Sequence, residues 1–151
     1  MMLYHYTNLL SARDIERDAV IKAAPIMLHR DPFGRDVGLV TRPLVWLTED
    51  SGFETTVFVK MLVSGWPSSP VGQMCRFVID GDIPCLALDQ YGAAKSIPPE
   101  WFVMMLSTAA MSGSNWMDWR ICETDITSKY WQAKQLLSGI GGVGGYTWKD
   151  M

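Results

Sequence analysis

The alternation of apolar and polar side chains predicts short strands at several places along the chain. Such alternation is typical of strands that bury one face against a core. Because successive side chains of a strand point to opposite faces, His5 and Thr7 share one face of the first strand. Tyr4 and Tyr6 lie on its other face. Five strands are predicted in this way, at residues 2–7, 44–48, 74–79, 83–88 and 116–124.

Helical patterns begin directly after the first strand. Thr7 or Asn8 can cap a helix over 8–19, because either side chain accepts a hydrogen bond from a main-chain N–H of the first turn. A second helix is predicted over 98–111, where prolines stand in a first turn that tolerates them. Residues 53–63 are either helical or partly extended, because their β-branched side chains disfavour a helix.

Prolines and glycines divide the chain into loops between these elements. Residues 23–43 form a long polar loop of the kind that often carries function, and residues 64–73 form a second loop. Residues 128–137 are a short helix or a strand. The glycine-rich end predicts a mobile tail over 138–151. One domain therefore spans residues 1–137.

Length and composition are those of one globular domain. The 151 residues are 48 % hydrophobic and 19 % charged, which suits a buried core rather than a disordered chain. The formal net charge is −3 and no basic run occurs, which disfavours binding to nucleic acid or to a membrane surface through bulk charge. The chain begins without a signal-peptide pattern and contains no apolar run of membrane-spanning length, which favours a soluble, cytoplasmic protein.

Several kinds of site are disfavoured by the residues present. Three cysteines without C-x-x-C spacing argue against a disulfide framework and a structural zinc site. No G-x-S-x-G motif occurs, and two histidines leave few bases for a serine or cysteine nucleophile. Neither histidine has a helical partner at metal-ligand spacing, so no metal is expected. The remaining candidates lie on predicted strands and are His5, Trp46 and Asp118, with Glu123 on the opposite strand face as an alternative acid.

Three short motifs occur in the order that one superfamily uses. The first is Tyr4-His5-Tyr6-Thr7 before the predicted helix, the second is the strand that contains Trp46, and the third surrounds Asp118. Together they resemble the ADP-ribosyltransferase superfamily, in particular the branch of the poly(ADP-ribose) polymerases and the DNA-ADP-ribosylating toxins. They also resemble small bacterial and phage proteins that begin with H-Y-T. The resemblance implies an α+β domain of split, mostly antiparallel sheets with a few helices.

The resemblance further implies that NAD is the substrate and that a macromolecule accepts the ADP-ribose. His5 and Thr7 would hydrogen-bond the dinucleotide, and Trp46 would stack on nicotinamide. Asp118 would stabilise the positive charge that builds on the anomeric carbon as nicotinamide leaves through an oxocarbenium-like state. Arginines of the 23–43 loop would bind the pyrophosphate through paired N–H groups. The candidates for this contact are Arg30, Arg35 or Arg42.

Two of the three motifs depart from the pattern of the superfamily. Trp46 stands where the family has tyrosine, and Asp118 stands where it has glutamate. The shorter acid loses about 1.5 Å of reach, and a displacement on that scale lowers a rate by about 100-fold. Two alternatives follow. One is a catalytically inactive member that binds a nucleotide or a protein partner, as a phage or toxin-type effector, and the other is an interaction domain in which His5 is structural.

Overall fold

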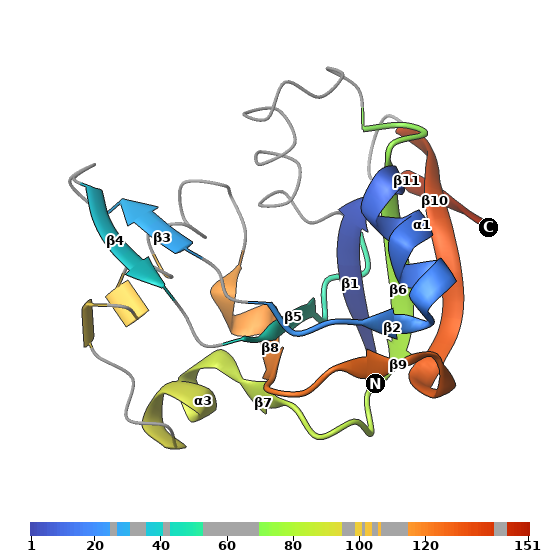
Figure 1. The fold of residues 1–151 in the computed structure, drawn as a ribbon. Helices are drawn as coiled ribbons and strands as arrows, with labels where there is room; N and C mark the ends of the chain where they lie inside the picture. Colours follow the sequence, from blue (N-terminus) through green and yellow to red (C-terminus); the bar gives the residue numbers. More distant parts are fainter. Residues whose placement is uncertain are drawn as a thin grey trace.

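The main feature of the fold is one seven-stranded antiparallel sheet (Figure 1). The computed structural model describes residues 1–24, 27–30, 36–40, 43–52, 70–94, 99–100, 102–103, 106, 115–140 and 145–151. The strands lie in the order β11-β10-β6-β1-β5-β8-β7, and every neighbouring pair is antiparallel. They are β1 (Met2–Asn8), β5 (Val45–Thr48), β6 (Met74–Asp80), β7 (Leu86–Ala87), β8 (Trp119–Cys122), β10 (Trp131–Ile140) and β11 (Tyr146–Asp150).

Short elements complete the described part of the chain. Two further antiparallel strand pairs lie outside the main sheet, β2 with β9 and β3 with β4. The predicted class, α+β with mostly antiparallel strands and few helices, is therefore confirmed. No helix among the described residues has the length and apolar character to cross a bilayer. The elements are α1 (Leu9–Asp18), β2 (Val20–Ile21), β3 (Met27–Arg30), β4 (Asp36–Val40), α3 (Leu88–Ala94), η1 (Trp116–Asp118), β9 (Ile126–Thr127) and η2 (Ser128–Tyr130).

Helix α1 begins and ends with local signals. The Asn8 side chain accepts a hydrogen bond of 2.8 Å from the main-chain N–H of Ser11, as expected of an N-cap. Ala12 is fully buried against the sheet. The helix ends at Ala19, which has the left-handed conformation φ 54° and ψ 32°. The helix predicted over 8–19 is thus confirmed to within one residue at each end.

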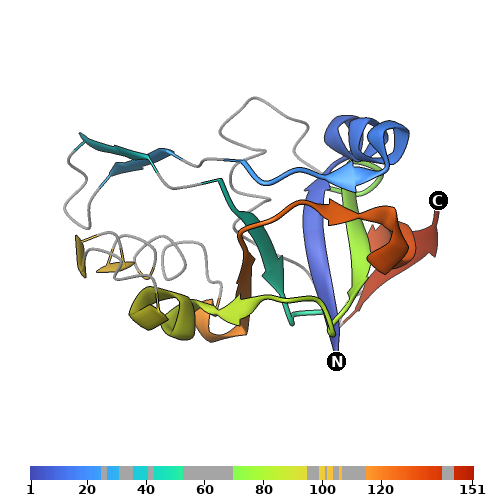
Figure 2. The same ribbon diagram turned by 60° about the horizontal axis from the view of Figure 1, so that its bottom comes forward.

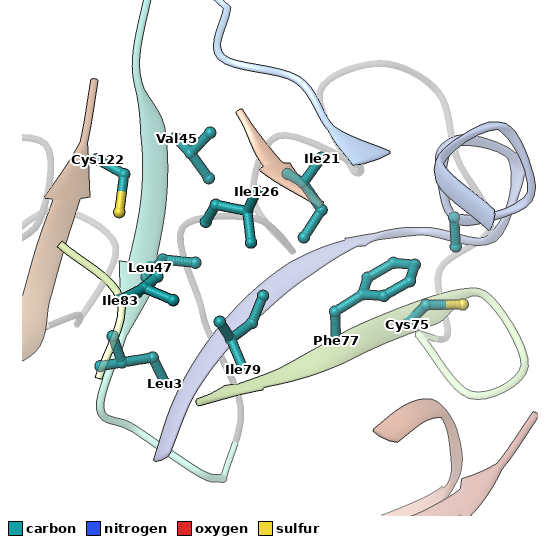
Figure 3. Close-up of a cluster of buried hydrophobic side chains, with 11 residues drawn as sticks. Leu3, Ile21, Val45, Leu47, Cys75, Phe77, Ile79, Ile83, Cys122 and Ile126 are labelled. Atoms are coloured by element: carbon teal, nitrogen blue, oxygen red, sulfur yellow. The ribbon is translucent and has the colours of Figure 1, made fainter. Parts of the chain in front are cut away.

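The two faces of β1 contribute to different clusters. Leu3 joins the main core with Phe77 and Ile79 of β6 and Val45 and Leu47 of β5, on the face that α1 covers (Figure 3). On the opposite face, a second cluster gathers side chains of β1, β6 and the two C-terminal strands. The alternation predicted for residues 2–7 is confirmed by this division. The second cluster contains Tyr6, Met74 and Leu137, with Tyr4 and Trp148 packed against them.

The two halves of the sheet meet between β1 and β5, and these two strands share very few main-chain pairs. β1 pairs with β6 along its whole length, from Met2 opposite Asp80 to Asn8 opposite Met74. With β5, by contrast, β1 is paired only where Tyr4 lies opposite Thr48. Figure 2 shows β5 running at an angle to β1. The two halves of the sheet therefore diverge on one side of this joint.

Three predictions about the N-terminal and central regions need correction. Residues 27–30 and 36–40 are strands, so the predicted loop 23–43 contains a hairpin. The strand predicted over 116–124 begins with η1 and is extended only over β8, because Asn115 caps a helical turn at Met117. The strand predicted over 83–88 is limited to β7 and leads directly into α3.

The C-terminal region forms more regular structure than predicted. Residues 128–137, left open between helix and strand, form η2 and most of β10. The predicted tail contains the end of β10 and all of β11, which pairs with β10 from Gln135–Asp150 to Ile140–Tyr146. The domain therefore extends beyond residue 137. Residues 53–63, predicted as helical or partly extended, lie outside the described residues, as does most of the helix predicted over 98–111.

Candidate functional site

His5 lies on β1 where that strand separates from β5. Its Nδ1 is 3.1 Å from the main-chain oxygen of Trp46. A carbonyl oxygen only accepts, so the imidazole donates from Nδ1, and a neutral ring then offers Nε2 as an acceptor. Burial lowers the pKa of His5, and the bond to Trp46 offsets this effect only in part. His5 is therefore a neutral, oriented ring at neutral pH.

A pocket of about 490 Å³ opens on the same face of β1. Its volume lies within the range of small-molecule sites, about 300–1,000 Å³. Four elements line it, namely β1, α1, β2 and the start of β5, so it occupies the space in which the two halves of the sheet diverge. His5 and Thr7 both line it, which brings together two residues of the first motif. Other lining residues include Ser11, Ile15, Ile21 and Val45.

The mouth of this pocket carries paired charges. Arg17 contacts Asp14 at 3.1 Å and Asp18 at 3.0 Å, and Lys22 contacts Asp18 at 3.0 Å. Hydrogen bonds from Lys22 and Arg17 hold the pKa of Asp18 below its usual value. All four side chains line the pocket. An anionic group that enters would find two cations there, each already shared with a carboxylate.

Trp46 approaches the pocket with its main chain and packs its ring elsewhere. The indole joins a cluster with Trp119 and Ile121, whereas its neighbours Val45 and Leu47 belong to the main core with Leu3. The Trp46 and Trp119 rings meet edge to face, with centroids 5.7 Å apart at 79°. His5 and Trp46 are thus brought together by a hydrogen bond from the His5 ring to the main-chain oxygen of Trp46, while the two rings point to opposite faces of the sheet.

Asp118 lies at the other end of β5 from the pocket. It is the last residue of η1, and its main-chain oxygen accepts a 2.9 Å hydrogen bond from the N–H of Glu49. Burial raises the pKa of the Asp118 carboxyl, and the negative charges of Asp50 and Glu49 add to the rise. Asp118 is not among the described residues that line the His5 pocket. The predicted acid and the predicted binding residues therefore occupy neighbouring regions rather than one cavity.

An ion pair that the sequence patterns did not single out holds the segment around Asp118. Arg120 places Nη2 2.5 Å from Oε1 of Glu49 and donates from Nη1 to the oxygens of Met117 and Trp119, at 3.2 and 3.1 Å. These carbonyls flank Asp118 on both sides. The available signal was the alternation that puts Asp118 and Arg120 on one face, combined with an acidic residue directly after the second strand.

The other predicted site residues are the alternative acid Glu123 and the three loop arginines, and none of them is among the described residues that line the His5 pocket. Glu123 follows β8, and its Oε1 accepts a 3.0 Å hydrogen bond from the hydroxyl of Tyr91 in α3. Arg35 and Arg42 lie outside the described residues. Arg30 is the last residue of β3, of which only the backbone is described.

No metal cluster is present in the part of the chain that the structure describes. There, no group of three or more His, Cys, Asp or Glu residues is arranged to hold an ion. Comparisons with models of protein families, with curated proteins and with solved structures found no match to this chain.

Proposed function

We propose that this protein is an NAD-dependent mono-ADP-ribosyltransferase that binds its dinucleotide in the pocket between β1, α1, β2 and β5. The observation that carries the proposal is the position of His5. Its ring spans the gap where β1 and β5 separate, and with Thr7 it faces a pocket of about 490 Å³. A split in an antiparallel sheet, lined by the first motif, is the kind of cleft that the resemblance to ADP-ribosyltransferases implies.

The pocket offers hydrogen-bonding groups of the kinds that a dinucleotide needs. Neutral His5 presents Nε2 as an acceptor for a ribose hydroxyl, because Nδ1 is held by Trp46. The hydroxyl of Thr7 can donate or accept, which suits a carboxamide or a ribose. Arg17 and Lys22 at the mouth can exchange their contact with Asp18 for a contact with phosphate oxygens. The ligand class favoured by these groups is a dinucleotide that brings ribose hydroxyls and a carboxamide to His5 and Thr7 and phosphates to Arg17 and Lys22.

In the proposed transfer reaction, Asp118 is the acid that acts by electrostatic stabilisation. Its carboxylate would stabilise the positive charge that develops on the anomeric carbon as nicotinamide departs. Arg120 and Glu49 hold the main chain on both sides of it, which fixes the backbone position from which the acid extends. A dinucleotide held at His5 must extend along β5 for its ribose to reach Asp118.

A second function is favoured by the separation of Asp118 from the pocket. A protein that binds NAD or a related nucleotide at His5 and Thr7, without transferring ADP-ribose, needs no acid in the same cavity. The replacement of glutamate by Asp118, with its shorter side chain, favours the same conclusion. This second candidate is the inactive, nucleotide-binding effector.

Thermal unfolding with and without NAD tests the binding step. A ligand present at about 100 times its dissociation constant stabilises the folded state by about 2.7 kcal/mol, so the melting temperature rises. We expect this rise for the wild type and for Lys149→Ala, an exposed change on β11, and its loss in His5→Ala. Absence of a rise in the wild type would refute the transferase and the binding of NAD, and would leave an effector for a related nucleotide or an interaction domain.

Transfer is tested separately with labelled NAD and a cell extract. An active transferase labels a macromolecule in the wild type and in Lys149→Ala, and loses labelling in Asp118→Ala while keeping the thermal shift with NAD. A thermal shift without labelling in the wild type would identify the nucleotide-binding effector instead. The free energy of unfolding of each variant without NAD shows whether the variant has retained its fold.

A further inference from the structure

Two of the three cysteines lie beside each other where β7 meets β8, because Cys85 directly precedes β7 and Cys122 is the last residue of β8. Leu86 of β7 pairs with Ile121 of β8, and Ala87 pairs with Arg120. Continuing this antiparallel register by one residue places Cys85 opposite Cys122. On its other side, Cys122 pairs with Val45 of β5, and Figure 3 shows its side chain near Leu47 and Ile83. Cys85 lies in the turn that leads into β7, where its N–H donates to the oxygen of Ile83 at 2.9 Å, and Cys122 is held within the sheet.

The spacing of such a pair suits a disulfide. Residues directly opposite in antiparallel strands have Cα atoms about 4.5 or 5.5 Å apart, depending on the ladder position. Disulfides span Cα distances of about 4.4–6.8 Å. Each thiol is among the groups that shift the pKa of the other, so the two side chains are close neighbours. Formation of a bond between the sulfurs thus requires no rearrangement of the strands.

The two thiols differ in environment. Cys122 is 2 % exposed, whereas Cys85 is only half-buried. The neighbouring Cys122 thiol lowers the pKa of Cys85, and the positive charge of Arg120 acts in the same direction, against the effect of burial. The neighbouring Cys85 thiol and burial raise the pKa of Cys122. Cys85 is therefore the thiol that an oxidant reaches and that reacts first, with Cys122 placed to resolve the product.

We propose that Cys85 and Cys122 form a reversible disulfide when the protein meets a small disulfide oxidant such as oxidised glutathione. The Cys85 thiolate attacks one sulfur of the oxidant, forms a mixed disulfide and releases one glutathione thiolate. Cys122 gives up its proton and attacks the Cys85 sulfur, which releases the second glutathione. In total, two protein thiols and one glutathione disulfide become one protein disulfide and two glutathione thiols.

The bond would add a covalent link to a part of the sheet where few main-chain pairs occur, beside the packing of Leu88 and Tyr91 against Ile121. β7 pairs with β8 through only two residue pairs, and α3 follows it directly. One further link between these elements is the hydrogen bond from Tyr91 to Glu123. A covalent bond at Cys85 holds the start of this β7–α3 segment on the strand that follows Asp118. The inference is independent of the function proposed for the pocket.

Peptide mapping of the folded protein tests the proposal. The protein is incubated with oxidised glutathione, and its remaining thiols are alkylated. It is then digested without reduction, and the masses of the peptides are measured by mass spectrometry. We expect a linked Cys85–Cys122 peptide in the wild type and in Cys75→Ser. Cys75 is buried in β6, and burial raises its pKa to about 11. It should therefore remain a free thiol that is alkylated only after the protein is unfolded. Recovery of Cys85 as a free thiol or as a stable mixed disulfide in the wild type would overturn the proposal.

Variants of the pair separate the disulfide from other effects of oxidation. In Cys122→Ser, Cys85 should remain as a glutathione mixed disulfide, because no resolving thiol is present. Cys85→Ser alters the less buried partner, so it remains informative if Cys122→Ser fails to fold. Oxidation should raise the melting temperature of the wild type and leave that of Cys85→Ser unchanged. An equal or lower melting temperature for the oxidised wild type would overturn the fastening of β7 to β8.

Discussion

The imidazole of His5 and the main-chain carbonyl of Trp46 meet across the gap between β1 and β5, with 3.1 Å between Nδ1 and the oxygen. The two residues are 41 positions apart in the chain. β1 and β5 are paired only at Tyr4 and Thr48, so this side chain supplies a hydrogen bond where the main chain of β1 does not. The hydrogen bond of His5 therefore adds a link between the halves of the sheet. The same hydrogen bond also fixes which nitrogen of His5 faces a ligand.

This relationship predicts a loss of stability in mild acid. The folded pKa of His5 lies below its value of 6.5 in the unfolded chain. As the pH falls below 6.5, the unfolded chain takes up a proton that the folded protein does not, and the free energy of unfolding decreases. The slope contributed by one such group is at most about 1.4 kcal/mol per pH unit. Urea unfolding between about pH 7.5 and 5.5 measures this loss.

The matched variant for this prediction is His5→Gln, whose side chain can still donate to the Trp46 oxygen but does not titrate. We expect its free energy of unfolding to change less over the same pH range. His29 and Asp118 are present in both proteins, so their titration cancels in the comparison. Identical pH slopes for the two proteins would show that His5 keeps an ordinary pKa.

The carboxyl of Asp118 should respond to its charged neighbours in opposite directions. Asp50 and Glu49 raise its pKa, and Arg120 lowers it. We therefore expect the pKa of Asp118 to fall in Asp50→Asn and in Glu49→Gln, and to rise in Arg120→Met. Titration of the side-chain carboxyl by NMR measures each shift. A shift in the same direction in all three variants would mean that changes in burial, rather than charge, control this group.

The local elements around β1 could be predicted because their causes are local. The alternation of residues 2–7 and the cap at Asn8 depend on neighbours within a few positions, and both agree with the structure. The class of fold follows from several such strands and few helices. The hairpin of β3 and β4 was missed because Pro25, Pro32 and Gly34 indicate turns without showing that the segments between them pair with each other.

The arrangement of the site depends on pairing between distant strands, which alternation within one strand does not determine. The pattern at 44–48 correctly separates Trp46 from Val45 and Leu47, but it does not show which face meets His5. The Arg120–Glu49 pair and the Cys85–Cys122 pair likewise follow from the registers of β8 with β5 and β7. The sequence therefore predicts which residues carry chemistry better than it predicts which of them meet.

The end of α1 offers a stabilising substitution. Ala19 has a left-handed conformation, which costs an L-residue about 1–2 kcal/mol and costs glycine almost nothing. Glycine also loses more backbone entropy on folding, so the net gain is smaller. We expect Ala19→Gly to raise the free energy of unfolding by up to about 1 kcal/mol. Ala12→Gly, in the buried middle of the helix, should lower it by about 1 kcal/mol or more. If both variants lose stability equally, the left-handed cap does not determine the effect at Ala19.

On the other face of the sheet, Arg76 of β6 holds the C-terminal strand and the chain after β5 together. Its guanidinium carbon lies 4.3 Å from the ring centroid of Trp148 and 4.9 Å from that of Tyr4. Nε donates to the Gln135 side chain at 2.8 Å, and Nη1 donates to the main-chain oxygen of Ser51. The planar group stacks and forms hydrogen bonds in several directions at once. A lysine ammonium cannot reproduce this arrangement.

We therefore expect Arg76→Lys to lower the free energy of unfolding by about 1–2 kcal/mol, although the charge is kept. The loss combines hydrogen bonds from a charged donor with stacking on two rings, each of which contributes on the order of 1 kcal/mol. Arg17→Lys is the matched control, because Arg17 forms exposed ion pairs on α1 and its replacement should change stability by less than about 0.5 kcal/mol. Urea denaturation of both variants measures the difference. Equal effects would mean that the stacking of Arg76 between Tyr4 and Trp148 adds nothing beyond its charge, and that β11 is held by its pairing with β10 alone.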